Sequence, residues 1–128
     1  MEWSVRAIRG ATTASENTET AMREAVTELL DELERRNPID LDRVISVTFS
    51  VTADLDAIFP AAIARSRPGW DNVPLLDVQH MSVRGDLDRC IRFLIHAYLP
   101  TRAPICHPYL RDAKALRPDL AAIPNPAK

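Results

Sequence analysis

Four arginines are the side chains best suited to chemistry in this sequence, because each stands beside apolar residues at the edge or within a predicted element. They are Arg9, Arg65, Arg92 and Arg117. A guanidinium keeps its charge and presents a planar fork of donors that matches a carboxylate. Arginines around a cleft suit a small dianion whose reaction needs shaping and electrostatic help rather than proton transfer. For an arginine chosen at random, a surface salt bridge is the commoner role.

Arg92 is the strongest of these candidates because it lies within a predicted strand. One set of side chains in this segment is apolar and alternates with a mixed set: Ile91, Phe93, Ile95 and Ala97 against Cys90, Arg92, Leu94, His96 and Tyr98. This period of two is typical of a strand with one buried face. Arg92 falls on the mixed face, where it must reach solvent, an acid or an anionic ligand held against the sheet.

Other catalytic chemistries have weaker support. His80 stands near Asp77, but the remaining histidines and cysteines lack the spacing of a metal site. Cys90 on a strand is more often a small buried residue than a nucleophile. No serine has an elbow motif, and three glycines provide no phosphate-binding loop. The sequence therefore predicts a site without a metal or cofactor.

Six segments are predicted to position these side chains. Strands are expected at residues 3–12, 43–51, 73–78 and 90–98, a long amphipathic helix from a cap at Ser15 or Asn17 to Asn37, and a short helix at 61–66 after Pro60. We expect Arg9 on the inner face of the first strand and the apolar third strand in the centre of the sheet. The order predicts a mixed α+β sheet with its main helix on one face. One helix covers a sheet incompletely, so a partner chain is expected on the other face.

Composition limits the domain organisation and the partners. The 128 residues carry a formal net charge of −2 and fit one domain, predicted at 1–120 and followed by a mobile tail at 121–128. Basic residues are scattered, which argues against a nucleic-acid partner, and no apolar run is long enough to span a membrane. Cys90 and Cys106 lack CxxC or zinc-like spacing, and the N-terminus has no apolar signal region, so we expect a reduced, cytoplasmic protein.

Several motifs in order resemble the trimeric chorismate mutases of the AroH type. The segments that carry the resemblance are RAIRGATT, TADLDAIFPAAIAR, GWDNVPLL, RCIRFL, PYL and LRPDL, which together run from about residue 5 to residue 120. IRGATT and LRPDL in this order and spacing are specific. The resemblance implies a pseudo-barrel homotrimer whose sites lie in clefts between adjacent subunits. It also implies a cofactor-free Claisen rearrangement of chorismate to prephenate in aromatic amino acid biosynthesis.

The resemblance also implies roles for individual residues. Arg9 and Tyr109 would hold the enolpyruvyl carboxylate, and Arg92 would donate to the breaking ether oxygen. The neighbouring chain would provide part of the substrate site. Its residues would be Phe59, Ala61 and Arg65, with Leu75 and Leu116 as an apolar wall and Arg117 near the mouth.

Three positions depart from the family pattern. His80 stands where a glutamate is usual, Asp77 where a cysteine is common, and Ala62 where a lysine is found. Asp77 and His80 could compensate for each other if His80 donates a hydrogen bond to the Asp77 carboxylate. Alternatively, an acid at position 77 suits a substrate with an amine in place of the hydroxyl, such as 4-amino-4-deoxychorismate. A non-catalytic trimer that binds a chorismate-like ligand is the third possibility.

Overall fold

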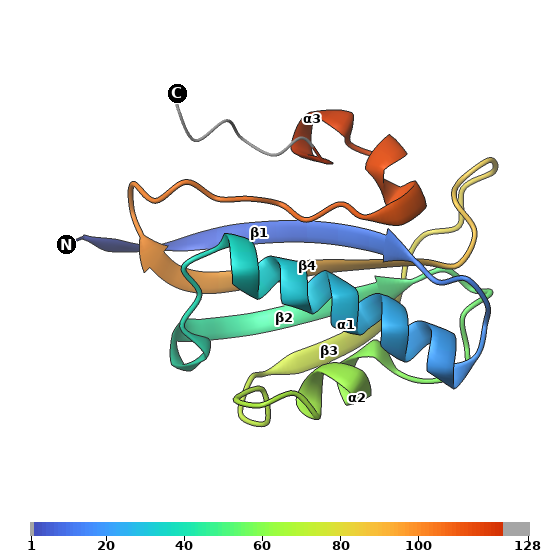
Figure 1. The fold of residues 1–128 in the computed structure, drawn as a ribbon, viewed down its shortest axis with the longest axis horizontal. Helices are drawn as coiled ribbons and strands as arrows, with labels where there is room; N and C mark the ends of the chain where they lie inside the picture. The colour runs from blue at the N-terminus through green and yellow to red at the C-terminus, as the bar shows by residue number, and fades with distance from the viewer. Residues whose placement is uncertain (1, 122–128) are drawn as a thin grey trace.

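A computed structural model describes residues 2–121 of the chain, which form one sheet with a long helix across one of its faces (Figure 1). The strands are β1 (Trp3–Thr13), β2 (Val44–Val51), β3 (Leu75–Gln79) and β4 (Cys90–Pro100), and the α-helices are α1 (Glu19–Arg36), α2 (Pro60–Arg65) and α3 (Pro118–Ala121). Short 3-10 helices span Leu41–Arg43 and Arg111–Ala115. The mixed α+β sheet with one long helix is the predicted fold class.

The sheet has the strand order β1-β4-β2-β3. β4 is antiparallel to both of its neighbours, whereas β2 and β3 are parallel and are joined through α2. β3 therefore lies at an edge, and its predicted central position is wrong. Its apolar composition indicated burial on both faces, but Leu76 and Val78 are exposed in the single chain.

One face of the sheet packs against α1 and contains the hydrophobic core. Met22, Val26 and Leu29 of the helix have no exposed surface, and they share one apolar cluster with Phe49 and Ile95 of the sheet. The cap of α1 differs from both predicted residues. Thr18 accepts a hydrogen bond from the Ala21 backbone N–H at 3.1 Å. No helix of residues 2–121 combines the length and apolar character needed to cross a membrane.

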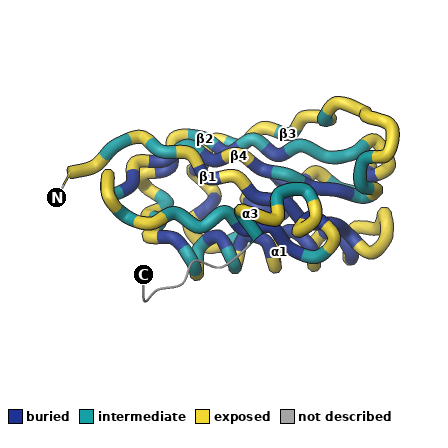
Figure 2. Tube along the Cα trace, turned by 90° about the horizontal axis from the view of Figure 1, so that it is seen from above, coloured by how far each residue is buried: buried dark blue, intermediate teal, exposed yellow. Residues whose placement is uncertain are grey.

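The opposite face of the sheet has no helix of the described chain across it (Figure 2). Register places Arg9, Leu94 and Thr48 side by side on this uncovered face. The prediction that Arg9 shares the inner face of β1 is therefore wrong. Ile8 is the β1 residue that enters the core, with no exposed surface, because the strand alternation runs one residue out of phase with the prediction.

The segment after β4 returns along the outer edge of β1. The Ala11 N–H donates to the Pro108 carbonyl at 3.0 Å, and the Leu110 N–H donates to the Ala11 carbonyl at 2.9 Å. This segment leads through the second 3-10 helix to α3, which lies beyond β1 (Figure 1). Of the predicted tail, Ala121 ends α3, and positions 122–128 lie outside the described residues.

Candidate active site

Arg9 and Arg92 line one shallow cleft on the uncovered face of the sheet. The same cleft is lined by Thr48 and Ser50 of β2 and by Leu94 of β4. Register explains this grouping, because Arg92 lies between Ala11 of β1 and Ser50 of β2 in the neighbouring strands. The central strand therefore places a guanidinium against the sheet, with a hydroxyl-bearing strand on one side.

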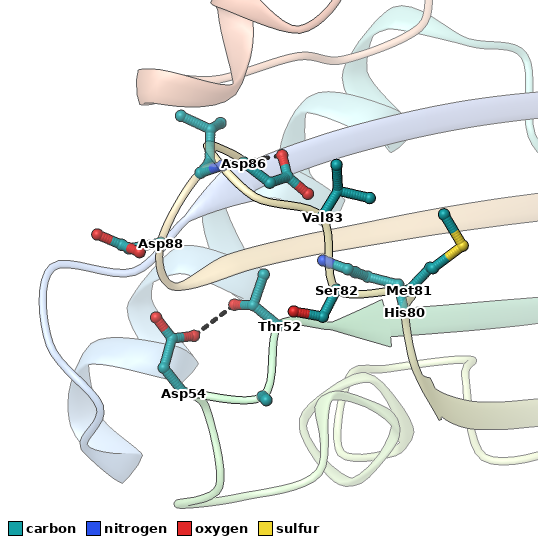
Figure 3. A pocket seen from close by; sticks show the side chains of 10 residues that line it. Thr52, Asp54, His80, Met81, Ser82, Val83, Asp86 and Asp88 are labelled. Carbon is teal, nitrogen blue, oxygen red and sulfur yellow. Dashed lines mark hydrogen bonds between the residues drawn. The ribbon is translucent and has the colours of Figure 1, made fainter.

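His80 follows the end of β3 and contacts Ser50, which lines the cleft of Arg92. Its Nδ1 lies 3.0 Å from the Ser50 hydroxyl oxygen, and its Nε2 is buried with no hydrogen-bond partner among residues 2–121. Burial, followed by the nearby Arg92 guanidinium, lowers the pKa of His80. The imidazole is thus held in its neutral form, which offers one donor and one acceptor. Figure 3 shows His80 beside the loop that leads from β3 to β4.

The arginines differ in their acidic partners. Most described arginines form a salt bridge within the chain: Arg23, Arg35, Arg36, Arg43, Arg67, Arg92, Arg111 and Arg117. Within residues 2–121, Arg9 and Arg65 have no carboxylate within salt-bridge distance. Arg65 is nevertheless close enough to Asp77 to oppose the rise that burial causes in the Asp77 pKa. These two guanidiniums are available for an external anion.

The C-terminal segment brings further candidates to the Arg9 end of β1. Tyr109 is buried and packs with Ala11, and Leu116 lies against the same small cluster. Arg117 pairs with exposed Asp119 at 2.8 Å and lies near Tyr109. The Arg9 backbone N–H donates to His107 Nδ1 at 3.0 Å, which ties this segment to β1.

The other candidates form a second group on the α1 side of the sheet. The Asp77 carboxylate accepts a hydrogen bond from the Ala61 backbone N–H at 3.0 Å, at the start of α2. Burial, the largest effect, raises the pKa of Asp77. Phe59 is 70% exposed and lines a cleft with Asp77, while Leu75 packs against the core. Arg65 ends α2 on the same side.

The chain therefore holds two separate groups of candidates. The first, on and around the uncovered face, contains Arg9, His80, Arg92, Tyr109, Leu116 and Arg117. The second, around α2 and β3, contains Phe59, Ala61, Arg65, Leu75 and Asp77. Because Asp77 and His80 belong to different groups, the hydrogen bond suggested between them is not formed.

Three residues near the site are not among the candidates predicted from the sequence. They are Ser50, which contacts His80, His107, which accepts the Arg9 N–H, and Asp86, which pairs with Arg92. The Ser/Thr alternation in β2 could have identified Ser50, because it shares the face of Arg92 across the strand pair. Partners of the other two depend on loop geometry, which leaves no periodic signal.

This arrangement suits binding and polarisation of an anion more than proton transfer or nucleophilic attack. The first group offers two guanidiniums, a neutral imidazole and a hydroxyl on the uncovered face of the sheet. Burial raises the pKa of the Cys90 thiol, which makes it a poor nucleophile. Among residues 2–121, no three His, Cys, Asp or Glu side chains gather closely enough to hold a metal ion.

Comparisons with known proteins agree on one family. Residues 5–120 match the family model described as chorismate mutase type I. The chain is 37% identical over 124 residues to chorismate mutase AroH of Bacillus subtilis (strain 168), covering 94% of this chain and 96% of that protein. It is 43% identical over 120 residues to chorismate mutase AroH of Thermus thermophilus, covering 91% and 96%. A solved chorismate mutase from Clostridium thermocellum superposes with a TM-score of 0.78 at 41% identity, covering 86% of this chain and 98% of that one.

Proposed function

The chain belongs to the type I chorismate mutase family, and we propose that it converts chorismate to prephenate at a cleft centred on Arg92. It is an isomerase of aromatic amino acid biosynthesis. The observation that best supports this site is that Arg9 and Arg92 share one cleft on the uncovered face, with Arg9 lacking an acidic partner among the described residues. Two guanidiniums so placed suit an anionic substrate in which a carboxylate and a nearby ether oxygen both accept hydrogen bonds.

The rearrangement needs shape and electrostatics but no covalent intermediate. In the proposed site, Arg9 and Tyr109 bind the enolpyruvyl carboxylate and hold the side chain of the substrate folded over its ring. Restricting the substrate to this form removes much of the entropic barrier. Arg92 then donates to the ether oxygen, where negative charge gathers as the bond breaks, and so stabilises the transition state more than the ground state.

Ordinary chorismate is favoured over its amino analogue. An acid free to meet an ammonium group would support the analogue, but the Asp77 carboxylate already accepts the Ala61 N–H at the start of α2. The neutral His80 imidazole suits a hydroxyl group, which can both donate and accept a hydrogen bond. We assign His80 to the ring hydroxyl, and Asp77 to holding the start of α2 within the site.

We also propose that the protein is a homotrimer in which each site combines two chains. The two groups of candidates lie on different sides of one sheet, so a single chain cannot close both around one ligand. The uncovered face is apolar as well, with Val5, Leu94 and Tyr98 all more than 40% exposed. A neighbour that covers this face would bring Phe59, Ala61 and Arg65 to Arg92, with Leu75 and Leu116 as walls and Arg117 at the mouth.

Activity and assembly can be tested together by complementation. Arg92→Ala and Arg65→Ala each remove one half of every site, so each variant alone should lose the absorbance decrease that accompanies chorismate consumption. When the two are co-expressed in equal amounts, a ring assembly leaves both halves intact at about a quarter of its interfaces. Recovery near that fraction supports shared sites. No recovery in an assembly that light scattering shows to be mixed would contradict them.

The amino analogue provides the second test. Purified protein should turn over chorismate with a higher kcat/KM than 4-amino-4-deoxychorismate, and Arg92→Ala should serve as the inactive control for both. A preference for the amine would reverse the assignment of Asp77. Binding of chorismate without turnover would instead support a ligand-binding trimer. We propose a cytoplasmic location because both cysteines are free thiols, which is typical of a reducing compartment.

A further inference from the structure

The loop from β3 to β4 brings an acid to Arg92. Nη2 of Arg92 lies 3.3 Å from each carboxylate oxygen of Asp86. Both side chains are partly shielded, with 38% of the Arg92 side chain and 22% of the Asp86 side chain exposed. The family resemblance assigns no role to Asp86. The guanidinium that is proposed to act on the substrate is therefore paired with an acid of its own chain.

Local backbone structure fixes where this carboxylate lies. The Asp86 N–H donates to the Val83 carbonyl at 3.1 Å, which closes a four-residue turn, and Gly85 takes its third position with φ of 84°. The turn is held at both ends, since the His80 N–H donates to the Val51 carbonyl at 3.1 Å and the Arg89 N–H to the Asp54 carboxylate at 2.9 Å. Asp86 is consequently presented by a tethered loop rather than by a free one.

The pair engages only one corner of the guanidinium. Nε of Arg92 is buried and has no hydrogen-bond partner among residues 2–121, and Nη1 forms no salt bridge there. The Asp86 carboxylate also accepts the Leu87 N–H at 2.8 Å, so its own orientation is set by the backbone. An arginine held at Nη2 by such a fixed acceptor loses rotational freedom, while Nη1 is left without a carboxylate partner among the described residues.

We propose that Asp86 is a positioning residue that presets the Arg92 guanidinium for the ether oxygen of the substrate. This inference rests on the proposed role of Arg92. Asp86 itself does not touch the reacting atoms. Its contribution is to reduce the number of orientations among which the Arg92 side chain must choose before the reaction, and preorganisation of this kind acts on turnover.

Two substitutions separate orientation from charge. Asp86→Ala removes the acceptor and should lower kcat between about 10- and 100-fold, with a smaller change in KM. Asp86→Asn keeps one oxygen for Nη2 and for the Leu87 N–H, so it should recover most of that loss. Asp88→Ala is the matched control, because Asp88 lies on the same loop but is exposed, and its carboxylate is directed away from Asp86 (Figure 3). The control should keep the kcat of the unmodified enzyme.

A double-mutant cycle then tests whether Asp86 acts through Arg92. In an Arg92→Lys background, Asp86→Ala should reduce kcat far less than it does in the unmodified enzyme, because the group it positions is gone. An undiminished reduction in that background would overturn the proposal. So would a lower KM with unchanged kcat in both Asp86 variants, because that result makes the carboxylate a competitor of the substrate.

The outcomes also separate this inference from the proposed function. If Arg92→Ala keeps full turnover, the assignment of the active site fails and Asp86 has nothing to position. If Arg92→Ala is inactive while Asp86→Ala is normal, only the role of Asp86 fails. If Asp86→Asn restores the melting temperature but not kcat, the charge of Asp86 rather than its positioned oxygen affects turnover, and the proposal is again overturned.

Discussion

The two faces of the same sheet do different work in this protein. The face toward α1 is a conventional core, where Leu29, Phe49 and Ile95 have no exposed surface. The other face exposes Leu94 and Tyr98 along the strand that carries Arg92, and no helix of the described chain lies over it. A period-two strand can thus use one set of side chains for folding and the alternate set for binding. Stability and chemistry should therefore respond to different substitutions.

The largest expected difference is between two leucine truncations. Leu29→Ala empties a fully buried site and should lower the free energy of unfolding by about 2–5 kcal/mol, measured by denaturant titration. Leu94→Ala removes a side chain that is 44% exposed in the single chain, so its cost should appear mainly through assembly. Its melting temperature should fall as the protein is diluted. Equal, concentration-independent losses in the two variants would abolish the contrast between the faces.

The next effect should be confined to chemistry. Arg92→Lys keeps the charge but replaces the planar fork by a point charge on a flexible stem, and we expect kcat to fall at least about 100-fold, close to 3 kcal/mol. The melting temperature should change little. Arg23→Ala, which removes an exposed ion pair with Glu19 on α1, is the control and should alter neither quantity appreciably. Near-normal turnover of Arg92→Lys would remove Arg92 from its assigned role.

The reverse pattern is expected at Gly10. A Cβ at this position would lie 2.5 Å from the Phe93 ring and 2.7 Å from the Pro108 carbonyl oxygen, so one of them must shift. Gly10→Ala should lower the free energy of unfolding by about 1–3 kcal/mol. The guanidiniums on the uncovered face are unchanged, so kcat below the melting transition should be largely retained. A stable but inactive Gly10→Ala protein would show that the two faces are more strongly coupled than proposed.

The smallest effect is a pH dependence from His80. Its pKa in the folded chain is lowered from the ordinary value of 6.5, first by burial and then by Arg92. As the pH falls below about 6.5, the unfolded chain takes up a proton that the folded chain resists, so stability decreases with falling pH until the folded-state pKa is passed. His107, also shifted downward chiefly by burial, adds to the same trend. His80→Gln should flatten the melting temperature between about pH 5 and 7; an unchanged slope would contradict this.

Sequence periodicity predicted the elements better than it predicted their neighbours. The alternation around Phe93 correctly identified β4 and the mixed face that carries Arg92. Periodicity could not show that β3 is an edge strand. A strand with apolar residues on both faces has the same sequence pattern whether those faces are buried by its own chain or by a partner chain. Capping by Thr18 instead of Asn17 escaped prediction for a related reason. Asn17 is used by tertiary contacts, accepting the N–H groups of Asp56 and Ala57.

The candidate site divides in the same way. The family motifs suggested the candidates of both groups, but they could not show that Asp77 contacts Ala61 at the start of α2 while His80 contacts Ser50. Both contacts depend on which side of the sheet each side chain takes, and residues 77 and 80 are separated by an odd number of positions at the end of a strand. The short spacing in the sequence suggested that Asp77 and His80 form a pair, but the strand geometry places them on opposite faces of the sheet.

The segment that returns along β1 also determines how this sheet can meet other sheets. Its hydrogen bonds to Ala11 occupy backbone groups that an edge strand would otherwise offer to another chain. The outer side of β3 pairs with no strand of the described residues. Another strand could therefore pair with β1 at Ala11 only if residues 108–110 first moved away, whereas no such obstacle lies along the outer side of β3 among the described residues.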